Sequence, residues 1–173
     1  MTADILSAHL PGDRVRPLLE AAEATDGIAA FSEAFVQGLD DERVRHTHLI
    51  VEDSGEVIAC AGIAEDGSAE LVVHPQRRRE GVGEALAEAV REQRPDAGLW
   101  AHGNLAGAQA LAGKLGLTVD RELLVMGIAA EEIPAGGAEL PEGFEALDYA
   151  EAVERWGRDA VDRPVSYTHL TLP

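Results

Sequence analysis

The stretch that decides the fold reads LVVHPQRRREGVG and occupies residues 71–83. It begins with an apolar, β-branched run, which favours a strand, and Pro75 ends that run. From Gly81 onward, apolar residues recur at the spacing of one helix face, at Val82, Leu86, Ala89 and Val90. The pattern predicts a strand that leads through a basic turn directly into an amphipathic helix.

This turn is suited to an anion. The first N–H groups of a helix have no partner within the helix, and the helix dipole places about half a positive charge there. Gly81 and Gly83 carry no Cβ, so a phosphate can approach the backbone. Arg77, Arg78 and Arg79 add a basic run in an acidic chain. We expect phosphate binding here; the alternative is that the glycines only make a turn and the arginines only a solvated face. No Gly-Lys-Ser/Thr follows, so the turn is not a P-loop.

The same periodicity, read outward from this stretch, predicts an α/β (α+β) fold with a mixed central sheet and helices on both faces. Upstream we expect a strand, two helices and an antiparallel meander of three strands, over residues 4–10, 14–24, 28–39, 48–52, 56–64 and 69–74. Downstream of the helix over 81–93 we expect a short strand, a helix stopped by a glycine and a final strand, over 98–101, 105–115 and 123–128.

Length and composition shifts divide the chain. Its 173 residues allow one domain with a piece of a second, at roughly 150 residues per domain. We expect the first domain to span 1–133 and a linker to span 134–143. Residues 144–163, with a helix over 151–162, would begin a second domain that is too short to cover its own apolar face. Residues 164–173 lack periodicity, and we expect them to be unstructured and foreign to the natural protein.

The charge balance restricts the partners. The chain has 14 Lys and Arg against 32 Asp and Glu, a net charge of −18, which argues against nucleic acid and anionic membranes and favours an amine-bearing small molecule. The N-terminus lacks the apolar core of a signal peptide, and no apolar stretch is long enough for a membrane span. The single cysteine, Cys60, excludes an internal disulfide, so we expect a cytoplasmic protein.

The order Val73-x-Pro75-x-x-Arg78-x-x-Gly81-x-Gly83 resembles the acyl-CoA signature of the GNAT superfamily of N-acetyltransferases. The resemblance implies that acetyl-CoA is the co-substrate, with its pyrophosphate on this turn and its pantetheine arm along the preceding strand. It implies backbone contacts with the coenzyme from the residues Val73, Arg78, Arg79, Glu80, Gly81, Val82 and Gly83. Arg79 stands where the family often has glycine.

A later segment also resembles the family. The run from Asn104 to Leu117 is similar to a helix that follows an asparagine in GNAT proteins, and the resemblance implies a coenzyme contact from Asn104. Ala112 occupies the position of the family's tyrosine, whose hydroxyl serves as the general acid for the departing thiolate. The sequence therefore predicts weak or no turnover by this chain alone.

Residues 99–112 and 117–126 resemble the N-terminal half of the mycothiol synthase family more specifically. The resemblance covers about residues 1–150 and implies two tandem GNAT domains, of which the second is missing here and would be a partner. It implies an acceptor, the cysteinyl amine of desacetylmycothiol. Two alternatives stay open, a stand-alone acetyltransferase for another amine and a non-catalytic domain that binds acetyl-CoA and braces a partner.

Catalysis requires a group that takes a proton from the acceptor amine. A cysteinyl α-amine titrates near about 8, so a carboxylate or an imidazole acting through water suffices. Glu70 and His102 are the candidates; the alternative for each is a surface or turn-capping role. His46 and His48 alternate along a strand without a third ligand nearby, so no metal site is predicted.

Overall fold

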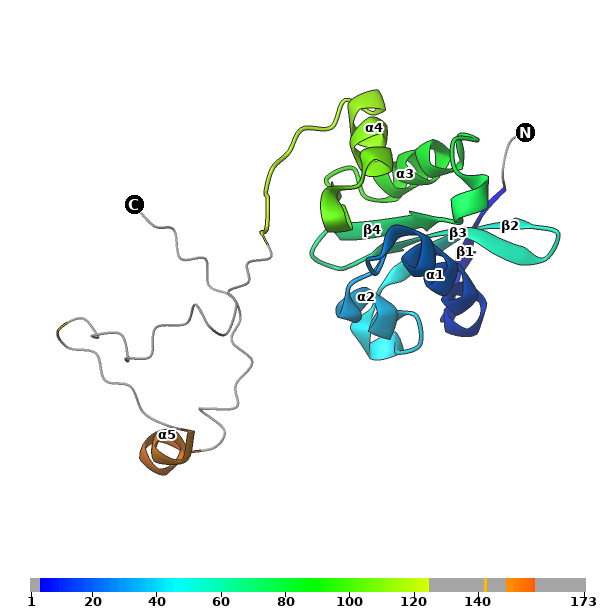
Figure 1. The fold of residues 1–173 in the computed structure, drawn as a ribbon. Helices are drawn as coiled ribbons and strands as arrows, with labels where there is room; N and C mark the ends of the chain where they lie inside the picture. Colours follow the sequence, from blue (N-terminus) through cyan, green and yellow to red (C-terminus); the bar gives the residue numbers. More distant parts are fainter. Residues whose placement is uncertain (1–3, 125–141, 143–148, 158–173) are drawn as a thin grey trace. The chain divides into compact units, whose positions relative to one another are not determined.

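The computed structural model describes residues 4–124, 142 and 149–157 (Figure 1). The chain divides into two compact units, Met1–Glu122 and Leu123–Pro173. The first unit holds the sheet, the core and every candidate site residue. The described part of the second unit includes one helix, α5 (Tyr149–Trp156), which covers the start of the helix predicted over 151–162. Residues 158–162 of that prediction lie outside the described residues.

Five strands form one mixed sheet in the order β1-β2-β3-β4-β5. Their bounds are β1 Ile5–Ala8, β2 Thr47–Asp53, β3 Glu56–Ile63, β4 Ser68–Val73 and β5 Gly98–Leu99. The first four strands are antiparallel neighbours, and β5 runs parallel to β4. A parallel neighbour requires a crossover, which the helix predicted after Gly81 supplies. The predicted meander and mixed sheet are confirmed.

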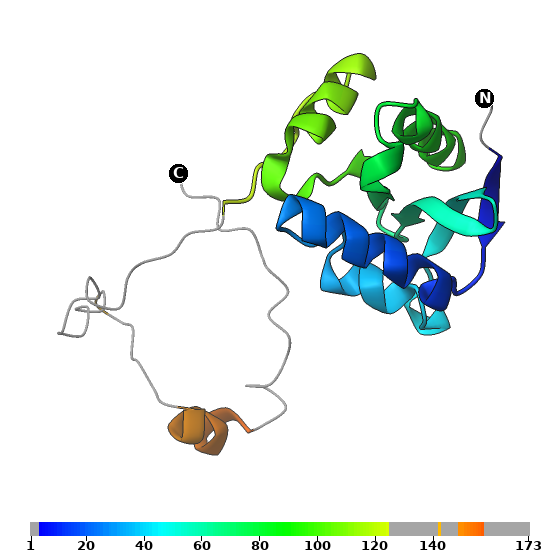
Figure 2. The same cartoon turned by 45° about the vertical axis from the view of Figure 1, so that its right-hand side comes forward.

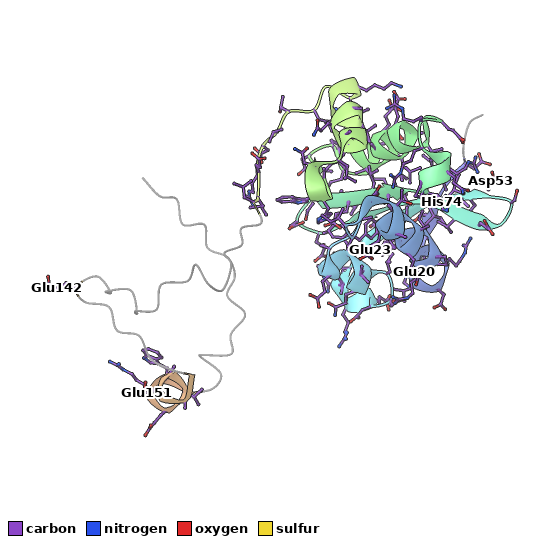
Figure 3. The ribbon with its side chains drawn as sticks, in the orientation of Figure 1. Glu20, Glu23, Asp53, His74, Glu142 and Glu151 are labelled. Carbon is purple, nitrogen blue, oxygen red and sulfur yellow. The ribbon has the colours of Figure 1, made fainter. Side chains whose placement is uncertain are left out.

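Helices cover both faces of this sheet (Figures 1 and 2). The helices α1 (Gly12–Asp26) and α2 (Glu33–Gly38) lie on one face, and α3 (Val82–Gln93) lies on the other. Along the strands, Ile50, Cys60 and Val72 pack toward α1, whereas Leu49, Ala61 and Ala69 pack toward α3. Because both faces are buried, the strands read as nearly continuous apolar runs rather than as alternating ones. Glu20 and Glu23 lie on the exposed side of α1 (Figure 3).

The remaining described elements are short. Three 3-10 turns, η1 (Glu42–Val44), η2 (Pro75–Arg77) and η3 (His102–Asn104), interrupt the connections, and α4 (Ala106–Lys114) follows η3. None of the described helices is long and apolar enough to cross a membrane.

Several predicted boundaries differ from the structure; the short strand predicted over 98–101, for example, ends at Leu99. The second helix begins at Glu33 rather than at residue 28, because Ser32 takes an extended conformation and starts the helix as its N-cap. The strand predicted over 123–128 is not seen at Leu123 and Leu124, and residues 125–128 lie outside the described residues.

Candidate active site

The edge of β4 that faces β5 is open over its second half. The N–H of His74 donates to the carbonyl of Ile58 across the β3–β4 ladder at 2.8 Å. The alternation of an antiparallel pair therefore turns the N–H and C=O groups of Leu71 and Val73 toward the opposite edge, where β5 lies.

The short strand β5 does not reach those groups. Its pairing with β4 covers only Ser68 and Ala69, and it ends with a bond from the Trp100 N–H to the Ala69 carbonyl at 2.9 Å. Beyond Ala69 the two strands separate. An extended ligand can lie along Leu71 and Val73 there and bond to the Leu71 backbone and the Val73 N–H as an added strand does. The Val73 carbonyl already accepts a bond from Arg78 Nε.

The turn from β4 into α3 presents unpaired amides. Gly81 is the N-cap of α3 and has a φ of 87°, a conformation that favours glycine. No side chain caps this helix, and within the described residues the amides of residues 79–84 donate no hydrogen bond. The first bond of the helix runs from Ala85 to the Gly81 carbonyl at 3.1 Å. A row of free amides at a helix start fits a phosphate group.

The side chains of Arg77 and Arg78 are engaged in ion pairs within the protein. Arg78 bonds both carboxylate oxygens of Asp26 at 2.7 Å, and its Nε donates to the Val73 carbonyl at 3.1 Å. Arg77 Nε donates to Glu80 Oε2 at 3.0 Å, and its Nη1 pairs with Asp53. Both guanidinium groups therefore hold the turn in place, and what Arg78 and Glu80 offer to an anion is their backbone.

Glu70 and His102 are brought together by the fold. Glu70 lies on β4 and is 3% exposed. The Ser32 N–H donates to Glu70 Oε2 at 2.7 Å, and Glu70 Oε1 lies 3.1 Å from His102 Nε2. His102 opens η3, directly after β5, and its side chain is 32% exposed. The pair thus joins a buried carboxylate to an imidazole that solvent reaches.

Two further histidines lie on the same face of the sheet. His48 pairs with Gly62 in the register, and Gly62 pairs with Glu70, so the three share one row. The His46 ring stacks near Phe35 with centroids 4.6 Å apart. Burial lowers the pKa of His48 to about 4, so this imidazole is neutral at pH 7. Burial also lowers the pKa of His46.

These histidines form no metal centre in the part of the chain that the structure describes. Within it, no group of three or more His, Cys, Asp or Glu side chains is arranged to hold a metal ion. His48 is one of the largest fully buried side chains and packs within the domain.

Asn104 and Ala112 lie in the segment that follows β5. Asn104 has a φ of 47°, its carbonyl accepts a bond from Gln109 Nε2 at 2.9 Å, and the residue is exposed. Ala112 lies in α4, the helix whose Lys114 pairs with Glu84 in the first turn of α3. The assignment of Asn104 to the coenzyme stays a prediction.

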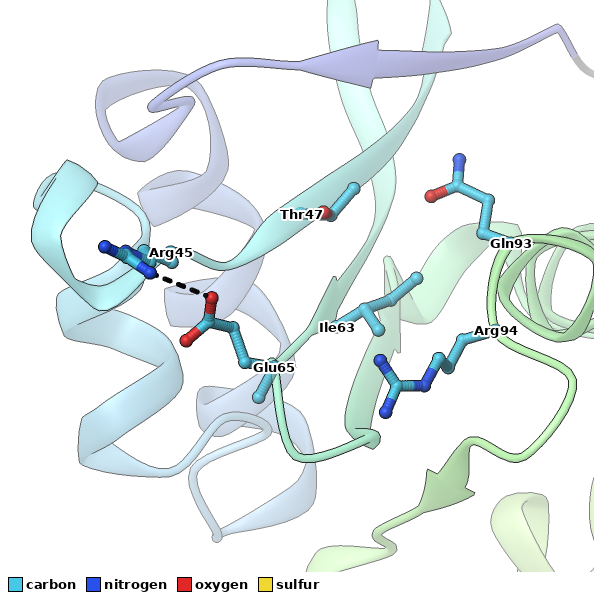
Figure 4. Close-up of a pocket in the computed structure, with 7 residues that line it drawn as sticks. Arg45, Thr47, Ile63, Glu65, Gln93 and Arg94 are labelled. Atoms are coloured by element: carbon cyan, nitrogen blue, oxygen red, sulfur yellow. Dashed lines mark hydrogen bonds and ion pairs between the residues drawn. The ribbon is translucent and has the colours of Figure 1, made fainter.

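One hollow of the surface lies away from the open edge of β4. A cavity of about 280 Å³ is lined by Arg45, Thr47, Ile63, Ala64, Glu65, Gln93 and Arg94 (Figure 4). Gln93 is the last residue of α3, whereas the amide-rich turn precedes the first, about 18 Å away at the rise of a helix. The hollow is therefore separate from the open edge of β4.

Comparison with known proteins decides the family. Residues 44–116, which include β2–β5, the turn and α3, match the family described as an acetyltransferase (GNAT) domain. Residues 44–116 are a GNAT acetyltransferase domain. This confirms the resemblance predicted from the stretch between Val73 and Gly83, and the matched GNAT domain contains the open edge and the Glu70–His102 pair.

Similar proteins share more than the GNAT domain. The mycothiol acetyltransferase of Corynebacterium kroppenstedtii is 36% identical over 173 residues, covering 86% of this chain and 48% of that protein. The mycothiol acetyltransferase of Corynebacterium glutamicum (strain R) is 43% identical over 136 residues, covering 78% of this chain and 45% of that protein. The chain thus spans about half the length of the curated relatives that it matches.

A solved structure shares the fold. The ribosomal-protein-alanine N-acetyltransferase of Brucella melitensis biovar Abortus 2308 superposes with a TM-score of 0.53 at 16% identity, covering 74% of this chain and all of that one. At this identity the likeness shows the GNAT fold alone.

Sequence reasoning missed two residues that hold the site together. Asp26 ends α1 and pairs with Arg78, and Ser32 supplies the amide that holds Glu70. Ser32 carries a sequence signal as a helix N-cap, but that signal does not indicate Glu70 as its partner. Nothing in the sequence links Asp26 to Arg78.

Proposed function

We propose that this chain binds acetyl-CoA and belongs to an enzyme that transfers the acetyl group to an amine. The observation that carries the proposal is the row of free amides over residues 79–84 beside the open backbone edge at Leu71 and Val73, in a GNAT domain. The amides and the α3 dipole would hold the pyrophosphate, and each charge-assisted bond contributes about 1.5–3 kcal/mol. The backbone of Leu71 and Val73 would hold the pantetheine arm.

The Glu70–His102 pair would take the proton from the acceptor amine. His102 is the member that solvent reaches, and Glu70 is the buried carboxylate held by the Ser32 amide. Glu70 would orient the imidazole and stabilise its protonated form, as a buried carboxylate does in a catalytic triad. An amine that titrates near about 8 requires no stronger base at neutral pH.

We propose the cysteinyl amine of desacetylmycothiol as the acceptor. Support comes from the relatives named mycothiol acetyltransferase, which are 36% and 43% identical to this chain.

A second GNAT domain would be the partner that completes the enzyme, because the chain spans about half the length of those relatives. The domain of residues 1–133 would then bind acetyl-CoA with weak or no turnover, since Ala112 supplies no hydroxyl to protonate the thiolate. The linker over 134–143 and the start of a second domain over 144–163 remain part of this proposal.

A second candidate acceptor is a cationic amine such as an aminoglycoside, acetylated by a stand-alone enzyme. The net charge of −18 favours it, because an acidic surface attracts cations. A turnover screen over a panel of amines separates the two acceptors. Turnover of a polycation with none on the cysteinyl glucosaminyl-inositol would contradict the mycothiol assignment.

Coenzyme titration tests the binding site. Gly81→Asp adds a side chain at a φ of 87° and a negative charge beside the pyrophosphate, so it should weaken CoA binding at least a hundredfold in calorimetry. Gly67→Asp is the matched control, because Gly67 has a φ of 86° and lies in the turn before β4, at the other end of that strand. Equal affinity of Gly81→Asp and the wild type would overturn the assignment.

Single substitutions test the proton acceptor. In the Ala112→Tyr background, which restores a hydroxyl for the departing thiolate, Glu70→Gln and His102→Gln should each lower acetyl transfer at least tenfold. The affinity for CoA should stay within twofold, because neither side chain lies on the coenzyme turn. Unchanged acetyl transfer in both variants would show that Glu70 and His102 have a structural role and do not accept the proton.

A further inference from the structure

His46 lies directly against α2. Its ring stacks near the Phe35 ring with centroids 4.6 Å apart, and a Cβ placed on Gly38 would overlap its Nδ1. Phe35 and Gly38 both belong to α2 and are buried. The helix therefore packs on the face of an imidazole, and the fit requires a glycine at position 38.

The buried side of this imidazole has no polar partner. Within the described residues, neither His46 Nδ1 nor the nearby His48 Nε2 has a hydrogen-bond partner, and the two ring centroids lie 6.2 Å apart. A neutral imidazole can bury an unprotonated nitrogen at moderate cost, whereas an imidazolium carries a charge and two N–H donors. His46 is half-buried, so a proton can reach it while the domain stays folded. Protonation of His46 should therefore weaken its packing against α2.

The charges that face His46 do not compensate for this burial. Burial lowers the pKa of His46 from its usual 6.5, although the carboxylates of Asp66, before β4, and Glu70, on β4, attract the proton. Arg45, the preceding residue, is engaged in an exposed ion pair, and residues 35–38 of α2 carry no charge. Because the pKa is lowered in the folded state, the contact with α2 is favoured above pH 6.5 and weakens as the pH falls through the lowered value.

The other end of α2 holds the candidate proton acceptor. Ser32, the N-cap of this helix, donates its N–H to Glu70 Oε2 at 2.7 Å. The helix spans only six residues, so the contact with Glu70 and the contact with His46 are separated by about 9 Å of helix. A helix of this length moves as one unit. A change in packing at its last turn therefore reaches the Ser32 amide.

We propose that α2 couples the protonation of His46 to the Glu70–His102 pair, so that acid releases the Ser32 amide from Glu70. With His46 neutral, α2 packs on the ring and the amide holds the carboxylate. With His46 protonated, α2 loosens and the carboxylate loses this bond. The consequence for acetyl transfer rests on the proposed function, whereas the coupling itself can be measured without turnover.

Amide hydrogen exchange followed by NMR on the whole chain tests this coupling. Between about pH 7.5 and about pH 5, the protection factor of the Ser32 amide should fall at least tenfold, with the midpoint at which the His46 Cε1 proton titrates. The amide of Cys60, in a strand paired on both sides, should keep its protection, because the domain stays folded. His46→Gln cannot take a proton and should keep the protection of Ser32 constant over this range.

An exposed histidine provides the matched control. His9→Gln should leave the wild-type transition at Ser32 in place. The inference is overturned if the transition persists in His46→Gln, if Ser32 shows no transition in the wild type, or if Cys60 loses protection in parallel with Ser32. Should His46→Gln fail to fold, a wild-type midpoint at Ser32 that differs from that of the His46 ring overturns it equally. Failure of the wild type to bind CoA would instead count against the proposed function.

Discussion

Arg78 and Asp26 form a two-bond ion pair that joins the turn before α3 to the end of α1. Nη1 and Nη2 of Arg78 each lie 2.7 Å from one carboxylate oxygen of Asp26. The Asp26 side chain is 13% exposed and the Arg78 side chain 34%, so the pair is partly shielded from water. The turn that presents the free amides is therefore positioned by a helix on the opposite face of the sheet.

Removing this pair should destabilise the domain in a pH-dependent way. The hydrogen bonds from Arg78 hold the pKa of Asp26 below its usual value of 3.8. A lowered pKa in the folded state means that the stabilisation is full above about pH 4 and is lost as the pH falls below it. Asp26→Asn should lower the free energy of unfolding by about 1–3 kcal/mol at pH 7, and urea titrations should show a smaller difference at pH 3.

A surface pair provides the control for that experiment. Arg45 Nη1 lies 3.4 Å from Glu65 Oε1, and the two side chains are 72% and 65% exposed. Glu65→Gln should change the unfolding free energy by less than about 1 kcal/mol, because exposed pairs contribute little. A difference for Asp26→Asn that stays constant down to pH 3 would contradict the ion-pair interpretation.

His48 should make the domain sensitive to mild acid. Burial lowers its pKa to about 4 from 6.5, so the unfolded chain binds a proton in this range and the folded chain does not. The unfolding free energy should therefore decline as the pH falls from 6.5 toward 4. His48→Gln should flatten this decline in urea titrations, whereas His9→Gln, at an exposed position, should change it only slightly, because His9 is the smallest of the causes that lower the pKa of His48. Parallel profiles for the wild type and His48→Gln would contradict the prediction.

Gly62 should not tolerate alanine. A Cβ at Gly62 would lie 2.6 Å from Phe35 Cδ1, and Phe35 is 5% exposed, so the ring has little room to withdraw. Gly62→Ala should cost about 1–3 kcal/mol of unfolding free energy. Gly113→Ala in α4 meets nothing within 4 Å and should instead stabilise the helix, by up to about 1 kcal/mol. Equal melting temperatures for the two variants would show that α2 repacks freely over the sheet.

Ala112→Tyr should raise acetyl transfer at least tenfold, because it restores a hydroxyl that can protonate the departing thiolate. Ala110→Tyr, at an exposed position on the same helix, is the matched control and should have no effect. Unchanged turnover with intact CoA binding would favour a domain that binds and braces a partner over a catalytic one.

Truncation after Ile133 should leave the first domain folded. Within the described residues, none after Val90 is buried, and Val90 lies well before that point. We expect the melting temperature to stay within about 5 °C of the full chain and CoA affinity to be unchanged. A larger fall would show that residues after 133 contribute to the fold.

The sequence by itself determined most of the elements and the turn of free amides before α3. The strands around Ser54 and Gly67, the meander and the helix after Gly81 follow from local periodicity, because side-chain spacing and turn residues act over a few positions. The turn could be recognised for the same reason, since its free amides depend only on a helix starting at Val82. The helix start at Glu33 escaped prediction because Ile28, which continues the apolar spacing, lies outside the helix and is 37% exposed.

Only the tertiary structure decided which side chains meet. Glu70 reaches His102 because β5 pairs with β4 in parallel, and it reaches Ser32 because α2 packs over that face of the sheet. The backbone of Arg78 was predicted to contact the coenzyme, and the tertiary structure pairs its guanidinium with Asp26. Strand register and helix packing set these contacts, and neither leaves a local signature, because each depends on residues far apart in the chain.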